Sequence, residues 1–260
     1  MILFIQLFLY LSLLLYTLAA ISYFVGQQNV IFSNAAFKIS AIGFVVNLLA
    51  LIMRILYTGR LPLVNGSEFI LSFAGFTVLI YLWYEVKSKV NSAGGVVMGI
   101  AVILIASIII LMPNQLLETH PLMPALKSPW LTSHVLTAVF AYAGFAVAAG
   151  LAAIELLKNK ETKGNSWIYK INSFSFAMLT LTIVLGAIWA EQAWGRYWSW
   201  DPKETWAGVT WIIYALYFHL HKSRKWQGKR ANIMVLAGFI LVLFTFFGVN
   251  YLILGLHSYA

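Results

Sequence analysis

The chain has 260 residues, of which 62% are hydrophobic and 10% are charged, and its formal net charge is +9 at pH 7. Soluble domains carry about 25% charged residues, so this composition excludes an ordinary soluble domain of this size. The absence of cysteine excludes a disulfide, a thiolate metal site and thiol redox chemistry within the chain itself.

Long apolar runs indicate helices that cross a membrane. A spanning helix needs about 20 apolar residues, whereas a β-barrel strand alternates in polarity over about 10 residues. Segments such as GIAVILIASIIILM do not alternate. The sequence therefore predicts an all-α, polytopic integral membrane protein with a single membrane domain, 1–260. We expect eight helices, roughly at 2–26, 35–56, 68–86, 95–112, 131–157, 168–190, 206–222 and 231–255. The first lacks a basic n-region and is long for a signal peptide, so we interpret it as a retained helix.

The distribution of charge predicts the orientation of these helices. Cytoplasmic loops carry excess Lys and Arg, and the loops at 158–170 and 222–230 hold nine basic residues between them. The side that contains these loops has twelve basic and three acidic residues, a difference that equals the net charge of the chain. The positive charge is thus a topology signal and gives no reason to expect nucleic acid. Both termini and the segment 189–211 are expected on the outer face.

Tryptophan is concentrated in one window, WAEQAWGRYWSWDPKETWAGVTW, which holds six of the ten tryptophans. Interfacial anchoring explains Trp189, Trp206 and Trp211 at the predicted helix ends. It does not explain the strip WGRYWSW, which places several flat aromatic faces between two helices. Such a strip suits a planar ligand such as a porphyrin.

Polar residues in and after this strip predict supporting roles. Gly195 permits close backbone approach or an unusual φ. Arg196 and Lys203 are candidates to pair with carboxylates such as haem propionates. In DPKE, Asp201 suits an N-cap, Pro202 the first helical position and Glu204 a capping box.

Histidines reach the same predicted face from distant parts of the chain. His134 lies near the outer start of the fifth helix and His257 near the outer end of the eighth. Two imidazoles beside flat aromatic walls are what a bis-histidine haem needs, whereas zinc or copper sites usually need more donors. His219 lies near the inner end of the seventh helix. We interpret His120 as a polar residue of a loop and His221 as a residue that borders the basic segment after the seventh helix, with no role in ligand binding for either.

The stretch WGRYWSWDPKETWAGVTW resembles the tryptophan-rich WWD motif of haem-handling proteins. Together with eight helices and flanking histidines, it is similar to the CcsA (ResC) family of System II cytochrome c biogenesis. The resemblance is densest from about residue 128 to the end. Residues 1–112, a four-helix part, fit the family mainly by topology, and residues 113–260 form the haem-handling part.

The resemblance implies a subunit of a cytochrome c synthase that works with a CcsB (ResB)-type membrane protein. Such a pair moves haem b across the membrane and holds it at the outer face, where its vinyl groups form thioethers with the CxxCH thiols of apocytochrome c. The membrane would be the bacterial cytoplasmic (inner) membrane, or the thylakoid membrane in a plastid.

The family's site residues carry over onto matching positions. His134 and His257 correspond to the two iron ligands of the outer site, and His219 to a transmembrane haem ligand that pairs with a partner histidine. The haem platform corresponds to Trp194, Gly195, Trp198, Trp200 and Asp201.

Three alternative functions stay open at this level. A CcmC-type protein delivers haem to a chaperone, a haem exporter performs no covalent chemistry, and a structural subunit needs only an aromatic belt. The CcmC type usually has six helices and lacks the DPKETWA continuation.

Overall fold

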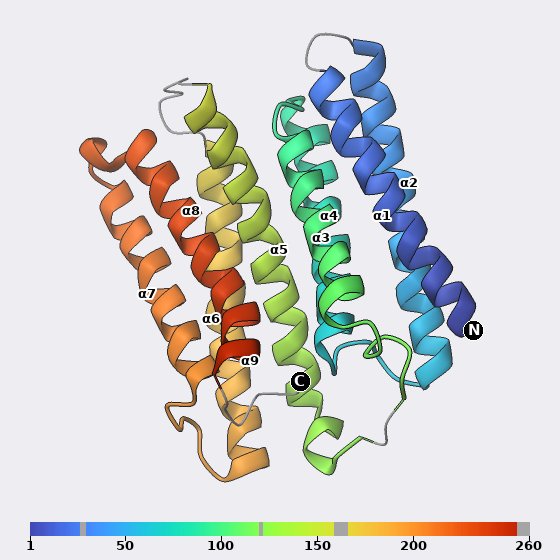
Figure 1. Ribbon diagram of the computed structural model, residues 1–260. Helices are drawn as coiled ribbons and strands as arrows, with labels where there is room; N and C mark the ends of the chain where they lie inside the picture. The colour runs from blue at the N-terminus through green and yellow to red at the C-terminus, as the bar shows by residue number, and fades with distance from the viewer. Residues whose placement is uncertain (27–29, 120–121, 159–165, 254–260) are drawn as a thin grey trace. The chain divides into compact units, whose positions relative to one another are not determined.

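The computed structural model describes residues 1–26, 30–119, 122–158 and 166–253, and every regular element in these ranges is helical (Figure 1). The long helices are α1 (Ile2–Val25), α2 (Val30–Thr58), α3 (Gly66–Ser88), α4 (Gly94–Leu111), α5 (Pro129–Leu157), α6 (Ser166–Trp194), α7 (Pro202–His221) and α8 (Lys229–Leu243). Shorter turns are the 3-10 helices η2 (Pro124–Lys127) and η3 (Arg224–Trp226), the π-helical η4 (Phe244–Gly248) and α9 (Val249–Leu252).

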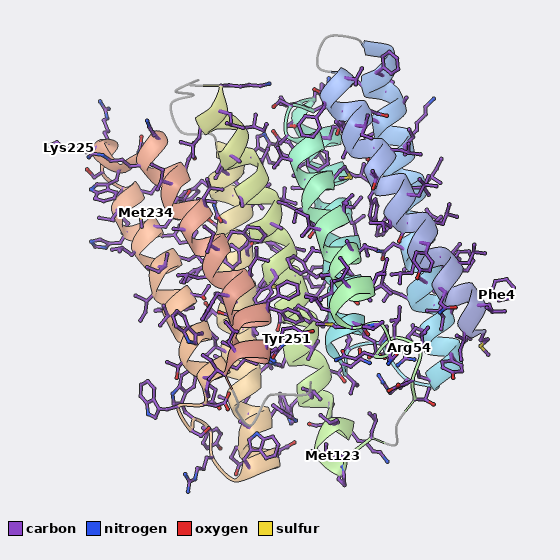
Figure 2. All side chains as sticks on the ribbon, viewed as in Figure 1. Phe4, Arg54, Met123, Lys225, Met234 and Tyr251 are labelled. Carbon is purple, nitrogen blue, oxygen red and sulfur yellow. The ribbon has the colours of Figure 1, made fainter. Side chains whose placement is uncertain are left out.

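The predicted all-helical membrane fold is confirmed. Among the described residues, seven helices are long and apolar enough to cross a membrane, the seventh running through α8, η4 and α9. Helix α7 has 20 residues, or about 30 Å, but its Trp, Tyr and His side chains lower its hydropathy. Large apolar side chains also project away from the helices, as Phe4 does with 55% exposure (Figure 2). Such surfaces fit lipid surroundings.

The chain divides into two compact units, Met1–Pro121 and Leu122–Ala260. In the first unit, α1 packs against α2 and α4, while α3 packs against the same two helices. Close packing of α1 on α4 depends on a glycine, because a Cβ at Gly94 would lie 2.5 Å from the Tyr23 ring. Small residues at such crossings let membrane helices approach closely.

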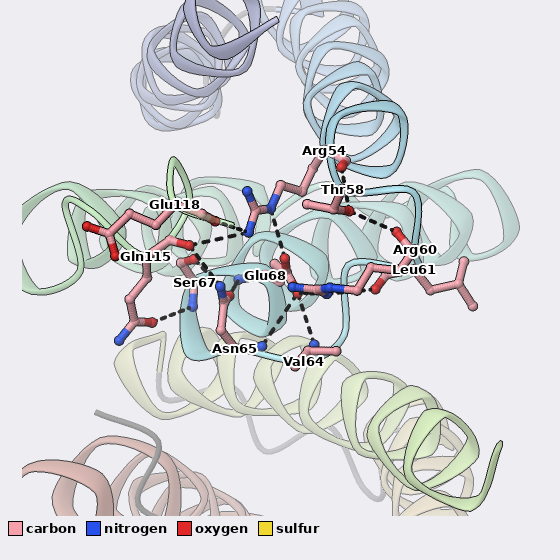
Figure 3. A network of polar contacts seen from close by, with 10 residues as sticks. All are labelled: Arg54, Thr58, Arg60, Leu61, Val64, Asn65, Ser67, Glu68, Gln115 and Glu118. Atoms are coloured by element: carbon pink, nitrogen blue, oxygen red, sulfur yellow. Dashed lines mark hydrogen bonds and ion pairs between the residues drawn. The ribbon is translucent and has the colours of Figure 1, made fainter. Parts of the chain in front are cut away.

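A buried ion network joins three segments of the first unit (Figure 3). The carboxylate of Glu68 accepts from Arg54 Nε through one oxygen and from Arg60 Nη1 through the other, each at 2.8 Å. Arg54 also donates through Nη2 to the Glu118 carbonyl at 2.9 Å. In addition, Glu68 and the N-cap Asn65 form a reciprocal capping box that begins α3. The network therefore ties the end of α2, the start of α3 and the segment after α4 together.

The second unit is built around α5, which packs against α6 and α8, while α7 packs against α6 and α8. The buried face of α5 is rich in Ala and Gly. A Cβ at Gly144 would lie 2.0 Å from Ser175 Oγ of α6, so a larger residue here would displace the Ser175 hydroxyl from its position. Phe145 of α5 stacks on Tyr214 of α7 with ring centroids 3.7 Å apart.

The antiparallel order of these helices gathers four helix ends at one end of the second unit. The start of α5, the end of α6, the start of α7 and the end of α8 lie there, with the segment 195–201 between α6 and α7 (Figure 1). The predicted boundaries on either side of the strip move: α6 continues to Trp194 and α7 begins at Pro202, so the connecting turn is shorter than expected.

Replacement of Glu68 by Gln should destabilise the chain by about 3–5 kcal/mol, because two arginines lose a carboxylate that is shielded from solvent. Denaturant unfolding in detergent measures the change. Glu191→Gln removes the same charge from an exposed site and should stay within about 0.5 kcal/mol of the parent. Equal losses in both variants would contradict a stabilising role for the network.

Candidate functional site

The tryptophan strip begins where α6 ends. Gly195 has φ +72° and its N–H donates to the Glu191 carbonyl at 2.8 Å, so a left-handed glycine terminates the helix. The unusual φ expected for Gly195 is therefore confirmed. Trp194 was expected between helices, but it is the last residue of α6, which continues until this glycine stops it.

The aromatic rings of this region form two groups. In the first, the Trp194 ring meets Trp189 edge-on at 5.8 Å, and Trp189 stacks on the His134 ring at 6.4 Å with 17° between planes. In the second, Trp198 and Trp200 are perpendicular at 5.9 Å. The structure thus brings His134, predicted from a distant segment, to the tryptophans at the end of α6.

Trp189 does not anchor the chain at an exposed interface, as its position had suggested. Its side chain is 1% exposed, and its Nε1 donates to the Ala125 carbonyl of η2 at 2.9 Å. The interfacial interpretation was wrong for this residue because η2 folds back and covers the end of α6. Trp211 likewise uses its indole N–H inside the unit, donating to Thr180 Oγ1 at 2.9 Å.

His134 is held in one orientation against α6. Helix α5 begins with the N-cap Ser128, and His134 follows in its second turn. His134 Nδ1 lies 2.8 Å from the Thr182 carbonyl oxygen. A carbonyl can only accept, so Nδ1 carries a proton, and in the neutral imidazole the ring lone pair lies on Nε2.

The ring reaches this carbonyl because Gly186 leaves space for it. A Cβ at Gly186 would lie 2.6 Å from His134 Nδ1. Neither Thr182 nor Gly186 was predicted as a site residue, and no sequence pattern marks them, because their role depends on where α5 crosses α6.

The start of α7 follows the predicted pattern. Asp201 is the N-cap, Pro202 occupies the first turn, and Asp201 and Glu204 form a reciprocal capping box. Asp201 is 6% exposed and accepts from the Lys203 backbone N–H at 3.0 Å. The candidate propionate contacts lie on either side of this cap, with Arg196 exposed in the turn and Lys203 in the first turn of α7.

His219 lies at the other end of α7, 18 positions and about 27 Å along the helix from Asp201. It borders an open hollow of about 320 Å³ whose other lining residues are Tyr169, Ser173, Phe176, Phe218 and Lys222. The structure therefore keeps His219 apart from the tryptophan strip, as the sequence predicted. His257 and His120 lie outside the described residues.

The fold defines a polytopic helical membrane protein in which Trp189, Trp194, Trp198, Trp200 and His134 gather at one end of the second unit. The chain belongs to the family of cytochrome c assembly proteins, whose family model matches residues 62–257. Curated relatives carry the name cytochrome c biogenesis protein CcsA.

Three of these relatives show how much is shared. The Synechococcus sp. (strain CC9605) protein is 35% identical over 250 residues, covering 80% of this chain and 81% of the relative. The Porphyra purpurea protein is 33% identical over 262 residues, covering 81% and 82%. The Chlamydomonas reinhardtii protein is 34% identical over 226 residues, covering 81% of this chain and 64% of its own length.

Among solved structures, the fold is similar to that of the cytochrome c haem lyase CcmF, with a TM-score of 0.78 over 95% of this chain. The identity is 19%, and the match spans 46% of CcmF, so the similarity concerns the fold.

Trp189→Phe should destabilise the second unit by about 1–3 kcal/mol, because it removes the hydrogen bond to η2 and leaves a cavity. Denaturant unfolding in detergent gives the value. Trp200→Phe serves as the control, since that indole is 75% exposed, and it should change stability by no more than about 0.5 kcal/mol. A Trp189 variant as stable as this control would contradict the packing role.

Proposed function

We propose that this chain is the haem-binding subunit of a cytochrome c synthase and acts with a CcsB (ResB)-type membrane partner. It delivers haem b, its substrate, to the outer face and positions it for attachment to the CxxCH segment of apocytochrome c. Membership of the cytochrome c assembly family and the CcsA relatives support this class of function. The observation that carries the proposal is that His134 is held by the Thr182 carbonyl and stacks on Trp189, which in turn contacts Trp194.

The chemistry of this seat fits haem iron. A histidine that binds a metal normally donates its other ring N–H to a carbonyl or carboxylate, which fixes the tautomer and raises ligand basicity. His134 makes such a bond to Thr182, so its basic nitrogen is Nε2. In our proposal His134 is one axial ligand and His257 the other.

The remaining residues hold the substrate in place. Exposed indole faces bind the ring, and Arg196 and Lys203 pair with the propionates. His219, at the opposite end of α7, is half of a second haem site that a partner histidine completes. The platform consists of Trp194, Gly195, Trp198, Trp200 and Asp201.

Positioning is the main contribution of such a site to the reaction. A thioether forms when a cysteine S–H adds across a vinyl C=C, which needs no external oxidant or reductant. Both thiols come from the apocytochrome, since this chain has no cysteine. Holding the reactants in the correct geometry can supply roughly 7–11 kcal/mol of the barrier reduction.

Co-expression with a CcsB-type partner and a secreted CxxCH reporter tests the function. If the chain acts as proposed, the reporter keeps its haem after denaturation, because the haem is covalently attached. The amount of this product then depends on both subunits. Free haem on the outer side without a thioether product would instead indicate an exporter or a CcmC-type delivery protein. A purified complex that never contains haem would indicate a structural subunit.

Gly186→Ala should abolish the bis-histidine absorption bands of the purified complex and lower haem affinity about 10–100-fold, because the new methyl group pushes His134 off the Thr182 carbonyl. Stability should fall by about 1–3 kcal/mol, because the new methyl group overpacks the contact with His134, so the spectra are compared on protein that folding measurements show to be intact.

Gly99→Ala is the matched control, because a Cβ at this helical glycine meets nothing within 4 Å. Its absorption spectrum should equal that of the parent. If Gly186→Ala also kept the parent spectrum, or if His134→Ala did, the assignment of His134 would be wrong.

A further inference from the structure

Trp200 has a backbone conformation that its side chain does not explain. Its φ is +59°, and Lys89 is the only other described residue besides glycine with a positive φ. The left-handed region is unfavourable for a residue with a Cβ, and bulky side chains seldom adopt it. The indole is 75% exposed, so burial does not offset this cost. Such a conformation persists only where neighbouring interactions impose it.

The hydrogen bonds of the two backbone N–H groups that flank Trp200 converge on Glu204, while Thr205 Oγ1 donates to the Trp200 carbonyl at 3.3 Å. The backbone N–H groups on either side of Trp200, those of Ser199 and Asp201, both donate to Glu204 Oε2, at 2.8 and 3.2 Å. The Ser199 hydroxyl lies 3.3 and 3.4 Å from the two carboxylate oxygens. One carboxylate oxygen thus brackets residue 200 from both sides.

Helix capping accounts for only part of this arrangement. In a capping box, the glutamate at the third helical position accepts from the N-cap N–H, here that of Asp201. The shorter bond, to Ser199, lies two residues before the cap and contributes nothing to it. That bond closes a tight turn around Trp200, which turns the indole outward.

We propose that Glu204 is a positioning residue that holds Trp200 in the left-handed conformation and so fixes the direction in which its indole is presented. The use of that indole as part of a haem platform rests on the proposed function. The positioning itself does not, because it concerns hydrogen bonds within the chain.

Two variants separate reach from charge. Glu204→Gln keeps the length of the side chain and an oxygen that accepts from both N–H groups, and glutamine also serves in a capping box. Glu204→Asp keeps the negative charge at the start of α7 but is one methylene shorter, so it loses the bond to Ser199. If Glu204 acts only through capping or charge, Asp should preserve the parent behaviour. If it acts because its side chain is long enough to reach the Ser199 N–H, Gln should preserve that behaviour and Asp should not.

The first measurement uses no haem. Hydrogen exchange of peptides covering 195–205, on the full chain in detergent, should accelerate about tenfold at Ser199 in Glu204→Asp and match the parent in Glu204→Gln. Acrylamide quenching of Trp200, obtained by difference from the matching Trp200→Phe protein, should change in the same pattern. Parent-like behaviour of Glu204→Asp in both measurements would overturn the proposal, as would exchange in Glu204→Gln as fast as in Glu204→Asp.

The second measurement connects positioning to the platform. Haem retained by the complex with the partner should fall in Glu204→Asp, and the double variant Trp200→Gly, Glu204→Asp should retain as much as Trp200→Gly alone, since Glu204 acts through Trp200. Additive losses would overturn that connection. Absence of haem in every variant and the parent would reject the proposed function, while the exchange and quenching results would still decide the positioning role.

Discussion

Backbone hydrogen bonding is the constraint on which the rest of this structure depends. In a hydrocarbon layer every N–H and C=O must be paired within the protein, so a chain this apolar is restricted to helices across the membrane. Irregular backbone exposed to lipid is excluded, so connecting turns lie where the spanning helices end. The one turn that carries the tryptophan strip accordingly lies between a left-handed glycine that ends α6 and a capping box that begins α7. The end of α6 and the start of α7 therefore determine where the tryptophan strip lies.

The same constraint explains how a polar ring is accommodated on an apolar helix. His134 lies in the second turn of α5, and the acceptor it finds is a backbone carbonyl of α6, that of Thr182. A helix carbonyl already accepts one bond but retains a second lone pair. The imidazole can approach it only where the neighbouring helix lacks a side chain, at Gly186. A single missing Cβ thus determines which ring nitrogen is basic.

Local features could be predicted from the sequence, because they depend on residues close together in the chain. The helices follow from apolar length, and the start of α7 from the order Asp, Pro, Glu. The capping box of Asn65 and Glu68 was not predicted, and its coupling to Arg54 and Arg60 depends on where α2 ends. The burial of Trp189 was likewise unpredictable, since it depends on η2 folding back over α6. Composition identifies Trp as interfacial on average and does not tell which indole is covered.

Burial along the strip indicates how an exposed platform can also be rigid. Trp189 is 1% exposed, Trp194 38% and Trp200 75%, whereas Trp198, between the last two, is half-buried. An exposed aromatic ring gains little from packing, but the left-handed backbone at Trp200 fixes the direction of its Cα–Cβ bond and so restricts the rotamers open to the ring. Buried Trp189 contacts η2, His134 and Trp194 and so supports the start of the strip. The carboxylate of Glu204 holds the backbone beside Trp200, at the end of the strip. In the function that we propose, η2 and Glu204 support these rings from outside the surface that binds haem. The ordering entropy of these rings is then spent on folding, and less of it opposes binding.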